Sequence, residues 1–158
     1  MPWYAIQHKP SQGDRALANL QNQNIQCLHP KVAVERIIAG KPTTRMEPLF
    51  PSYIFICIDP SDPCWGKLRS TRGLLRVVSF GGRAAGLIPD EVIDYINDSL
   101  KTIESHGGLK QGEQIQIEKG PFRSLEGIFQ AYDGEERAIV LISLMQSQHR
   151  VKVRLGDL

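Results

Sequence analysis

The sequence predicts an α+β protein: an antiparallel sheet with helices packed on it, then a linker and a small second domain. Three observations lead to this prediction. Short strand-like segments alternate with two amphipathic helical segments over the first 100 residues. A polar stretch containing the adjacent glycines Gly107 and Gly108 follows them. The remaining residues, 111–158, are too few for a large hydrophobic core of their own.

The chain opens with a strand followed by a helix. Residues 3–8 (WYAIQH) have the composition of a strand. Residues 11–24 (SQGDRALANLQNQN) have helical spacing, and Ser11 or Asp14 is placed to cap the start. The apolar side of this helix carries Ala16, Leu17 and Leu20. Its polar side carries Arg15, Asn19, Asn22 and Gln23.

The sequence of the rest of the first domain predicts a hairpin, two further strands and two helices. Residues 29–50 form two strands around a tip at 39–41, and residues 52–58 form a strongly apolar strand. A short helix is expected within 61–70, and a strand over 74–80. The second long helix starts at Pro89-Asp90-Glu91, since proline and acidic residues suit a first helical turn. Its apolar side carries Val92, Ile93, Ile96 and Leu100.

The second domain fits two patterns. We expect a first domain over 1–100, a flexible linker over 101–110 and the second domain over 111–158. Ile115 and Ile117 alternate as in a strand that ends at Gly120-Pro121. The later stretch AIVLISLM, residues 138–145, has helical spacing but equally suits a buried strand. Either short apolar runs are simply ambiguous, or two packings lie close in free energy and a partner selects between them.

Composition excludes several classes of protein. Hydrophobic residues make up 41% and charged residues 23% of the 158 positions, which is normal for a globular chain. Because the net charge is only +2, binding of nucleic acid requires a local basic patch. An odd cysteine count argues against a disulfide framework, and a single Cys27-x-His29 pair is weak support for a metal. We expect a reduced, cytoplasmic, soluble protein without a membrane segment, metal or cofactor.

Catalysis is not indicated by the residues. The four histidines are scattered, and neither a nucleophile–base arrangement nor a phosphate-cradling loop with a following lysine occurs. We therefore expect a binding protein with no catalytic residues.

The segment EPLFPSYIFI, residues 47–56, gathers aromatic rings beside a turn stiffened by two prolines. Such rings suit a packed core, a surface for a partner protein or a stacking platform for nucleic acid. Strand alternation puts Tyr53 and Phe55 on one face and Ile54 and Ile56 on the other. We expect Ile54 and Ile56 to lie in the core.

An ordered set of motifs resembles one family. WYAIQHKP, EPLFPSYIFI, TRG at 71–73 and GEQIQIEKGPFRSLEGIF resemble the NusG family of transcription elongation factors, and the last stretch looks like a KOW motif. CLHPKV, the Gly40-Lys41 hairpin and the leucine-rich end look most like a specialised antitermination paralogue within that family. This resemblance implies a C-terminal domain that is an α-helical hairpin when docked on the N-terminal domain and a five-stranded β-barrel when released.

The resemblance also implies a surface for RNA polymerase. Family members grip the clamp helices of the polymerase β′ subunit with apolar side chains, a form of helix-in-groove binding. The matching positions are Phe50, Pro51, Tyr53, Phe55, Ile93 and Ile96. A docked C-terminal hairpin would cover this exposed apolar patch. Glu47 and Arg137 match an interdomain ion pair, and we expect them to help hold the closed state.

A second implied surface meets the non-template DNA strand. Lys and Arg would hold phosphates while Asn and Gln meet base edges, although such a polar stripe is also typical of an ordinary solvated helix face. The matching positions are Lys9, Arg15, Asn19, Asn22, Gln23, Thr71 and Arg72. The side chains at Asn19 and Asn22 depart from the cationic or aromatic ones of the best-known paralogue, so the DNA element recognised is open.

The remaining expectations concern partners. The β gate loop of polymerase is a further candidate contact, but Cys64-Trp65-Gly66 replaces the polar pattern that makes it in the paralogue. The released C-terminal domain is expected to bind a small-subunit ribosomal protein, and the chain is expected to be a monomer. Two alternatives stay open: a general NusG-like factor with a permanent KOW barrel, and a KOW-bearing module that binds RNA or the ribosome.

Overall fold

The computed structural model describes residues 2–81, 84–110, 128 and 134–156, and these fall into two units. The first unit comprises Met1–His29, Ser52–Asp90 and Met145–Leu158, and the second comprises Pro30–Pro51 and Glu91–Leu144. The strand predicted around Ile115 and Ile117 lies outside the described residues. The structure confirms the α+β class and the antiparallel sheet.

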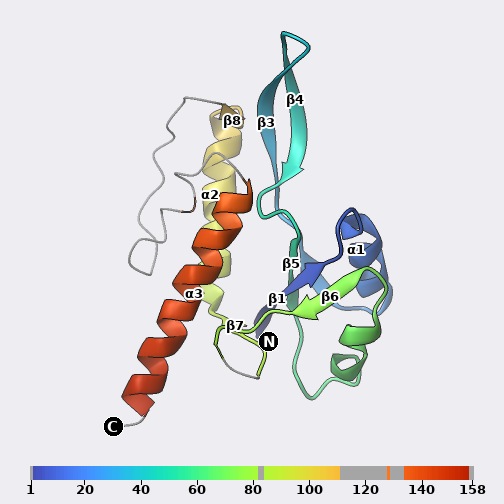
Figure 1. The fold of residues 1–158 in the computed structure, drawn as a ribbon, viewed down its shortest axis with the longest axis vertical. Coiled ribbons are helices and arrows are strands. Elements are labelled where there is room, and N and C mark those ends of the chain that lie inside the picture. Colours follow the sequence, from blue (N-terminus) through green and yellow to red (C-terminus); the bar gives the residue numbers. More distant parts are fainter. Residues whose placement is uncertain (1, 82–83, 111–127, 129–133, 157–158) are drawn as a thin grey trace. The chain divides into compact units, whose positions relative to one another are not determined.

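The first unit is built on a five-stranded antiparallel sheet with β1 near its centre (Figure 1). Its strands are β2 (Gln26–Leu28), β5 (Tyr53–Cys57), β1 (Trp3–His8) and β6 (Leu74–Val77) in that order, with β7 (Leu87–Ile88) also paired to β1. The strand predicted over 74–80 therefore stops at Val77. β2 and β7 were not predicted, because segments this short show no periodicity.

The core of this unit lies on one face of the sheet, under α1 (Gly13–Asn22) and the 3₁₀-helix η1 (Trp65–Ser70). In the register, Ile6 lies opposite Ile54 and Tyr4 lies opposite Ile56. These side chains pack with Ala16 and Leu20 of α1 and Leu68 of η1. The prediction that Ile54 and Ile56 are core residues is confirmed, and each fully buried side chain contributes about 1.5–3 kcal/mol.

Helix α1 starts without the side-chain cap that was predicted. Its N-cap residue is Gln12, whose side chain makes no capping hydrogen bond. Ser11 adopts a left-handed backbone with φ of 61°, which removes it from the capping position. Asp14 lies inside the first turn, where its charge favours the positive end of the helix dipole instead.

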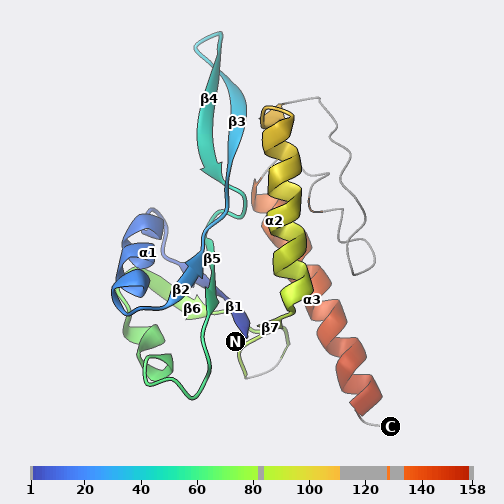
Figure 2. The same cartoon turned by 180° about the vertical axis from the view of Figure 1, so that it is seen from behind.

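The second unit contains the predicted hairpin, formed by β3 (Lys31–Ile38) and β4 (Lys41–Pro48). Figure 2 shows it as a continuous two-stranded ribbon that ends in a tight tip. Ala39 and Gly40 close the tip with φ of 53° and 77°, the positive values that a two-residue hairpin turn requires.

The predicted linker over 101–110 contains regular structure. Helix α2 (Asp90–Ser105) continues into it, and Leu109–Lys110 form β8, which pairs in parallel with β3. The two glycines that suggested flexibility lead directly into β8. A Cβ at Gly108, where φ is 98°, would collide with the carbonyl oxygen of Ala33, so glycine is needed for the close approach of the strands.

The C-terminal stretch is helical. Helix α3 (Gly134–Gly156) includes the whole of AIVLISLM, so the structure takes the helical alternative there. Two acidic residues, Glu135 and Glu136, occupy its first turn and suit a helix start. Ala138, Leu141 and Met145 are buried, which gives α3 one apolar side. The described residues contain no five-stranded barrel.

Candidate functional site

The residues proposed to meet DNA come together where α1 faces the segment after η1. Asn19 donates from its side chain to the carbonyl oxygen of Arg72 at 3.1 Å. Gln23 donates to the hydroxyl of Thr71 at 3.0 Å and to the carbonyl oxygen of Asn19 at 3.2 Å. These hydrogen bonds tie α1 to residues 71–72 and fix the position of Arg72.

These bonds divide the proposed DNA-binding residues by role. Thr71 is buried and donates to the carbonyl oxygen of Lys67 at 3.1 Å, so its hydroxyl has a structural task. Both hydrogen bonds that the Gln23 side chain donates are internal, and its buried Oε1 accepts none from the residues that the structure describes. Asn22 stays exposed on α1. Asn19 and Gln23 therefore hold the segment of Thr71 and Arg72 against α1.

Three cations line an open cleft of about 530 Å³, which we call the basic cleft. Lys9, Arg15 and Arg72 lie around it with Pro10, Gln12 and Gly73. The backbone N–H of Lys9 donates to the carbonyl oxygen of Gly73 at 2.7 Å, which joins the end of β1 to the segment after η1.

The start of α1 adds to the positive character of the basic cleft. Gln12, the N-cap residue of α1, lines the cleft, so the positive end of the helix dipole lies beside the cations. Such an arrangement suits phosphate groups. Three of the cations proposed from the sequence line this cleft, and their role in binding DNA stays a prediction. The cleft itself depends on the approach of Gly73 to α1, which periodicity cannot predict.

Four of the six side chains assigned to polymerase binding are buried. Phe50, Phe55, Ile93 and Ile96 have exposed fractions between 0% and 3%, whereas Pro51 and Tyr53 are half-buried. Phe55 lies on the opposite face of the sheet from Ile54 and Ile56, so both faces of β5 are covered. The apolar patch is therefore not an exposed surface in this conformation.

Helix α3 contacts the turn that contains Phe50 and Pro51. We call Leu49, Phe50 and Pro51 the docking turn. Arg137, only 2% exposed, donates from Nε to the carbonyl oxygen of Leu49 at 2.9 Å. The backbone of Gly134 lies so close to Pro51 that a Cβ there would be 2.7 Å from the proline Cδ. The first turn of α3 thus fits against the docking turn through a buried hydrogen bond and a glycine contact.

Glu47, at the end of β4, has a partner that the sequence did not reveal. Arg36 donates to both carboxylate oxygens of Glu47, at 2.6 and 2.7 Å. These hydrogen bonds lower the pKa of Glu47, partial burial opposes them, and the charges of Arg36, Arg137 and Arg45 lower it further. Arg137 therefore acts on Glu47 through its charge, but whether the two form the expected ion pair stays a prediction.

The Arg36–Glu47 pair joins residues that do not lie opposite each other. Glu47 is opposite Val32, and Arg36 is opposite Thr43, with the Val34–Arg45 pair between them. All these side chains share one face of the hairpin because alternate residues do. The long side chains of Arg36 and Glu47 therefore meet diagonally across the two strands. The strand register is the signal that could have suggested this pair.

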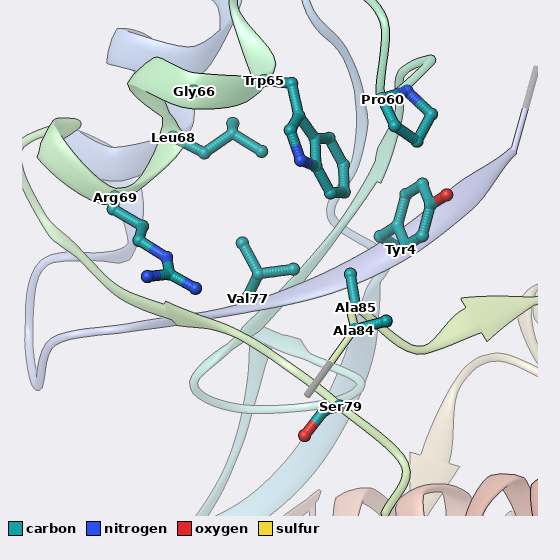
Figure 3. Close-up of a pocket in the computed structure, with 10 residues that line it drawn as sticks. All are labelled: Tyr4, Pro60, Trp65, Gly66, Leu68, Arg69, Val77, Ser79, Ala84 and Ala85. Atoms are coloured by element: carbon teal, nitrogen blue, oxygen red, sulfur yellow. The ribbon is translucent and has the colours of Figure 1, made fainter. Parts of the chain in front are cut away.

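Trp65, whose role the sequence left open, packs inward. Its ring meets that of Tyr4 at 4.9 Å in an edge-to-face arrangement, and it packs with Cys64 against the core. The two rings form one wall of a cavity of about 770 Å³, and Figure 3 shows Leu68 and Arg69 on another side. Burial raises the pKa of Tyr4, with a smaller contribution from Asp59.

Cys27, Cys57 and Cys64 are free thiols. Burial raises the pKa of the Cys27 thiol to about 11, so this thiol is a poor nucleophile at neutral pH. Within the described part of the chain, no group of three or more His, Cys, Asp or Glu side chains could hold a metal ion. Among the helices described, none has both the length and the apolar character needed to cross a membrane.

Comparison with known proteins identifies relatives over most of the chain. A family model described as "Transcription termination factor nusG" matches residues 1–97. The protein named "Transcription termination/antitermination protein NusG" from Thermus thermophilus is 30% identical over 145 residues, covering 79% of each chain. The protein of the same name from Helicobacter pylori is 31% identical over 157 residues, covering 89% of this chain and 87% of the relative.

Proposed function

The chain belongs to the NusG family, and from this membership we propose that it is a transcription elongation and antitermination factor of the specialised RfaH type. Such a factor binds RNA polymerase and the non-template DNA strand, and reduces pausing and termination at particular operons. The observation that carries the proposal is the buried hydrogen bond from Arg137 to Leu49, which holds α3 on the docking turn.

The polymerase surface is proposed to become available when α3 leaves the docking turn. The residues assigned to the β′ clamp helices are Phe50, Pro51, Tyr53, Phe55, Ile93 and Ile96. Phe50, Ile93 and Ile96 are buried in the same unit as the first part of α3, so they cannot meet polymerase in this conformation. Departure of α3 would expose rings and branched side chains, the chemistry that suits a helix laid into a groove.

The DNA surface is proposed to bind phosphates in the basic cleft. Lys9, Arg15 and Arg72 supply the charge, and the exposed Asn22 supplies an amide for base edges. Asn19, Gln23 and Thr71 act by holding Arg72 in place.

The C-terminal domain is proposed to change both fold and partner. We assign the N-terminal domain to 1–100 and the KOW-type domain to 111–158, with 101–110 joining them. On release, the second domain would become a five-stranded barrel and bind a small-subunit ribosomal protein, so coupling transcription to translation. The factor is proposed to act in the cytoplasm as a monomer, without cofactor or catalytic chemistry. The β gate loop of polymerase remains a candidate contact.

A general NusG-like factor with a permanent KOW barrel is the second candidate function. The relatives named above favour it, because both carry the name NusG. The helical state of residues 134–156 favours the specialised type, because a permanent barrel would place strands there.

The experiment that tests the proposed function measures binding of the full-length chain to RNA polymerase. We compare the unmodified chain with Gly134→Ala, whose added Cβ disturbs the contact with Pro51. An autoinhibited factor binds polymerase more tightly when α3 is loosened. Equal affinity of both chains would support the permanent barrel, and no binding by either would overturn the assignment to polymerase.

A further inference from the structure

The cavity of about 770 Å³ beside Trp65 lies within the first unit and shares no lining residue with the basic cleft. Its volume is in the range of sites that bind small molecules. The walls come from β1, η1 and β6 and from the segment that follows β6 (Figure 3). A ligand in this cavity would therefore be distinct from the phosphates of the basic cleft.

Hydrogen bonds hold two opposite walls of the cavity in place. At the start of η1, the backbone N–H of Trp65 donates to the carbonyl oxygen of Asp62 at 2.9 Å. Beyond the end of β6, the backbone N–H of Gly86 donates to the carbonyl oxygen of Val78 at 2.9 Å. A Cβ at Gly86 would collide with the ring of Phe80, so this ring packs directly on the glycine backbone. The cavity is thus fixed by the fold around it.

Most of the side chains that line the cavity are apolar. The buried Leu68 lies there with Val77 and Ala85. The edge-to-face pair of Tyr4 and Trp65 completes this lining. Aromatic side chains contact further rings favourably, either offset or edge to face. The apolar part of a fitting ligand is therefore an aromatic ring.

Two hydrogen-bond donors of the cavity are available to a ligand. The indole N–H of Trp65 and the guanidinium group of Arg69 form no hydrogen bond or ion pair with the residues that the structure describes. Figure 3 shows the indole nitrogen on the side of its ring that faces Leu68 and Arg69. Both groups donate only, and Arg69 is positively charged. They favour a negatively charged acceptor, and a guanidinium group matches the two oxygens of a carboxylate.

We propose that this cavity binds a small aromatic carboxylate. Its ring lies against Leu68 and Val77, and its carboxylate accepts hydrogen bonds from Arg69 and from the indole N–H of Trp65. Arg69 is exposed and Leu68 is buried, so the charged end of the ligand stays near solvent while the ring is covered. The inference goes beyond the proposed function, because this binding requires neither DNA nor polymerase.

The test follows the NMR signals of the two tryptophan indole N–H groups in the isotope-labelled full-length chain. Trp65 lines the cavity and Trp3 does not, so Trp3 is an internal reference, and Trp65→Phe assigns the two signals. The probe is naphthylacetate, and its neutral amide, naphthylacetamide, is the matched ligand. We expect naphthylacetate to move the Trp65 signal until saturation. It should bind roughly two- to fivefold more tightly than the amide, the range for exposed ion pairs.

Two variants of η1 locate the preference for negative charge. Arg69→Gln should lower the affinity for naphthylacetate to that for the amide. Lys67→Gln is the matched control, because Lys67 is an exposed cation of the same helix that does not line the cavity, and the preference should persist in it. A Trp65 signal that does not move, equal affinities for acid and amide, or a preference that survives in Arg69→Gln would overturn the proposal. The polymerase-binding experiment tests the proposed function independently of these results.

Discussion

At the scale of single residues, the docking of α3 depends on contacts that sequence patterns do not reveal. Gly134 precedes the charged residues 135–137 that lead into the apolar run, and its position after Asp133 in the sequence is typical of an Asp-Gly turn. In the structure the absence of a side chain at Gly134 leaves room for the ring of Pro51. Arg137 was identified through its resemblance to an ion-pair residue, and in the structure its Nε donates to the backbone carbonyl of Leu49.

Gly134→Ala is expected to loosen the docked helix although alanine is the better helix former. Alanine favours a helix by about 1 kcal/mol over glycine in helix interiors. Its Cβ would lie 2.7 Å from Pro51 Cδ, closer than real contacts allow. Amide exchange at residues 138–145 should therefore become faster. Ile139→Ala is the control, because Ile139 is an exposed α3 residue, and slower exchange in Gly134→Ala would contradict the fit described.

The pKa of Glu47 predicts a specific loss of stability in acid. Hydrogen bonds from Arg36 lower this pKa in the folded state, so the stabilisation is present above the ordinary value of 4.5. It is lost as the pH falls below 4.5 and through the lower folded pKa. The midpoint temperature of thermal unfolding should fall more steeply with decreasing pH in this window for the unmodified chain than for Glu47→Gln. Parallel curves for the two chains would show that the pair contributes nothing.

At the scale of elements, strong periodicity in the sequence predicted the strands and helices correctly. Close approaches between backbone segments could not be predicted in this way. The strand over 3–8, the hairpin and α2 follow from alternation or helical spacing. The composition of segment 101–110, with Gly107 and Gly108, suggested flexibility, whereas the structure has the end of α2 and β8 there, and Gly108 serves the packing of β8 on β3. Alternation also could not decide which face of β5 is buried, since Ile54 and Phe55 both are.

The pairing of β8 with β3 predicts different costs at two adjacent glycines. Both have positive φ, 85° at Gly107 and 98° at Gly108, so alanine is strained at either. Only at Gly108 would the Cβ also collide with Ala33. A Cβ at Gly107 would have no atom within 4 Å among the described residues other than its chain neighbours. In urea unfolding, Gly108→Ala should lose more than about 1 kcal/mol beyond the loss in Gly107→Ala. Equal losses would argue against the β8–β3 contact.

The basic cleft predicts a measurable salt dependence. Each phosphate neutralised on a single strand contributes about 0.7 to the slope of log affinity against log salt. Replacing Lys9, Arg15 and Arg72 together by Gln should weaken binding of single-stranded DNA and lower this slope by about 2. Lys41→Gln, at the base of the exposed hairpin tip, is the control. A slope that is unchanged in the triple variant would place the DNA elsewhere.

At the scale of the whole molecule, the proposed function depends on one conformational equilibrium, between docked and released α3. The family could be recognised from motifs spread along the sequence, and the family model matches residues 1–97. The secondary structure of the C-terminal stretch could not be predicted from the sequence. AIVLISLM suits a strand as well as a helix, and the residues packed against it decide between them. The docking turn is one such neighbour, and polymerase would compete with α3 for it.

The measurement that tests this claim most directly is the carbon chemical shifts of residues 134–147 in the intact chain, alone and with RNA polymerase. We predict helical shifts in the free protein and their loss when polymerase binds. Strand-like shifts in the free protein, or helical shifts that persist in the complex, would contradict the account.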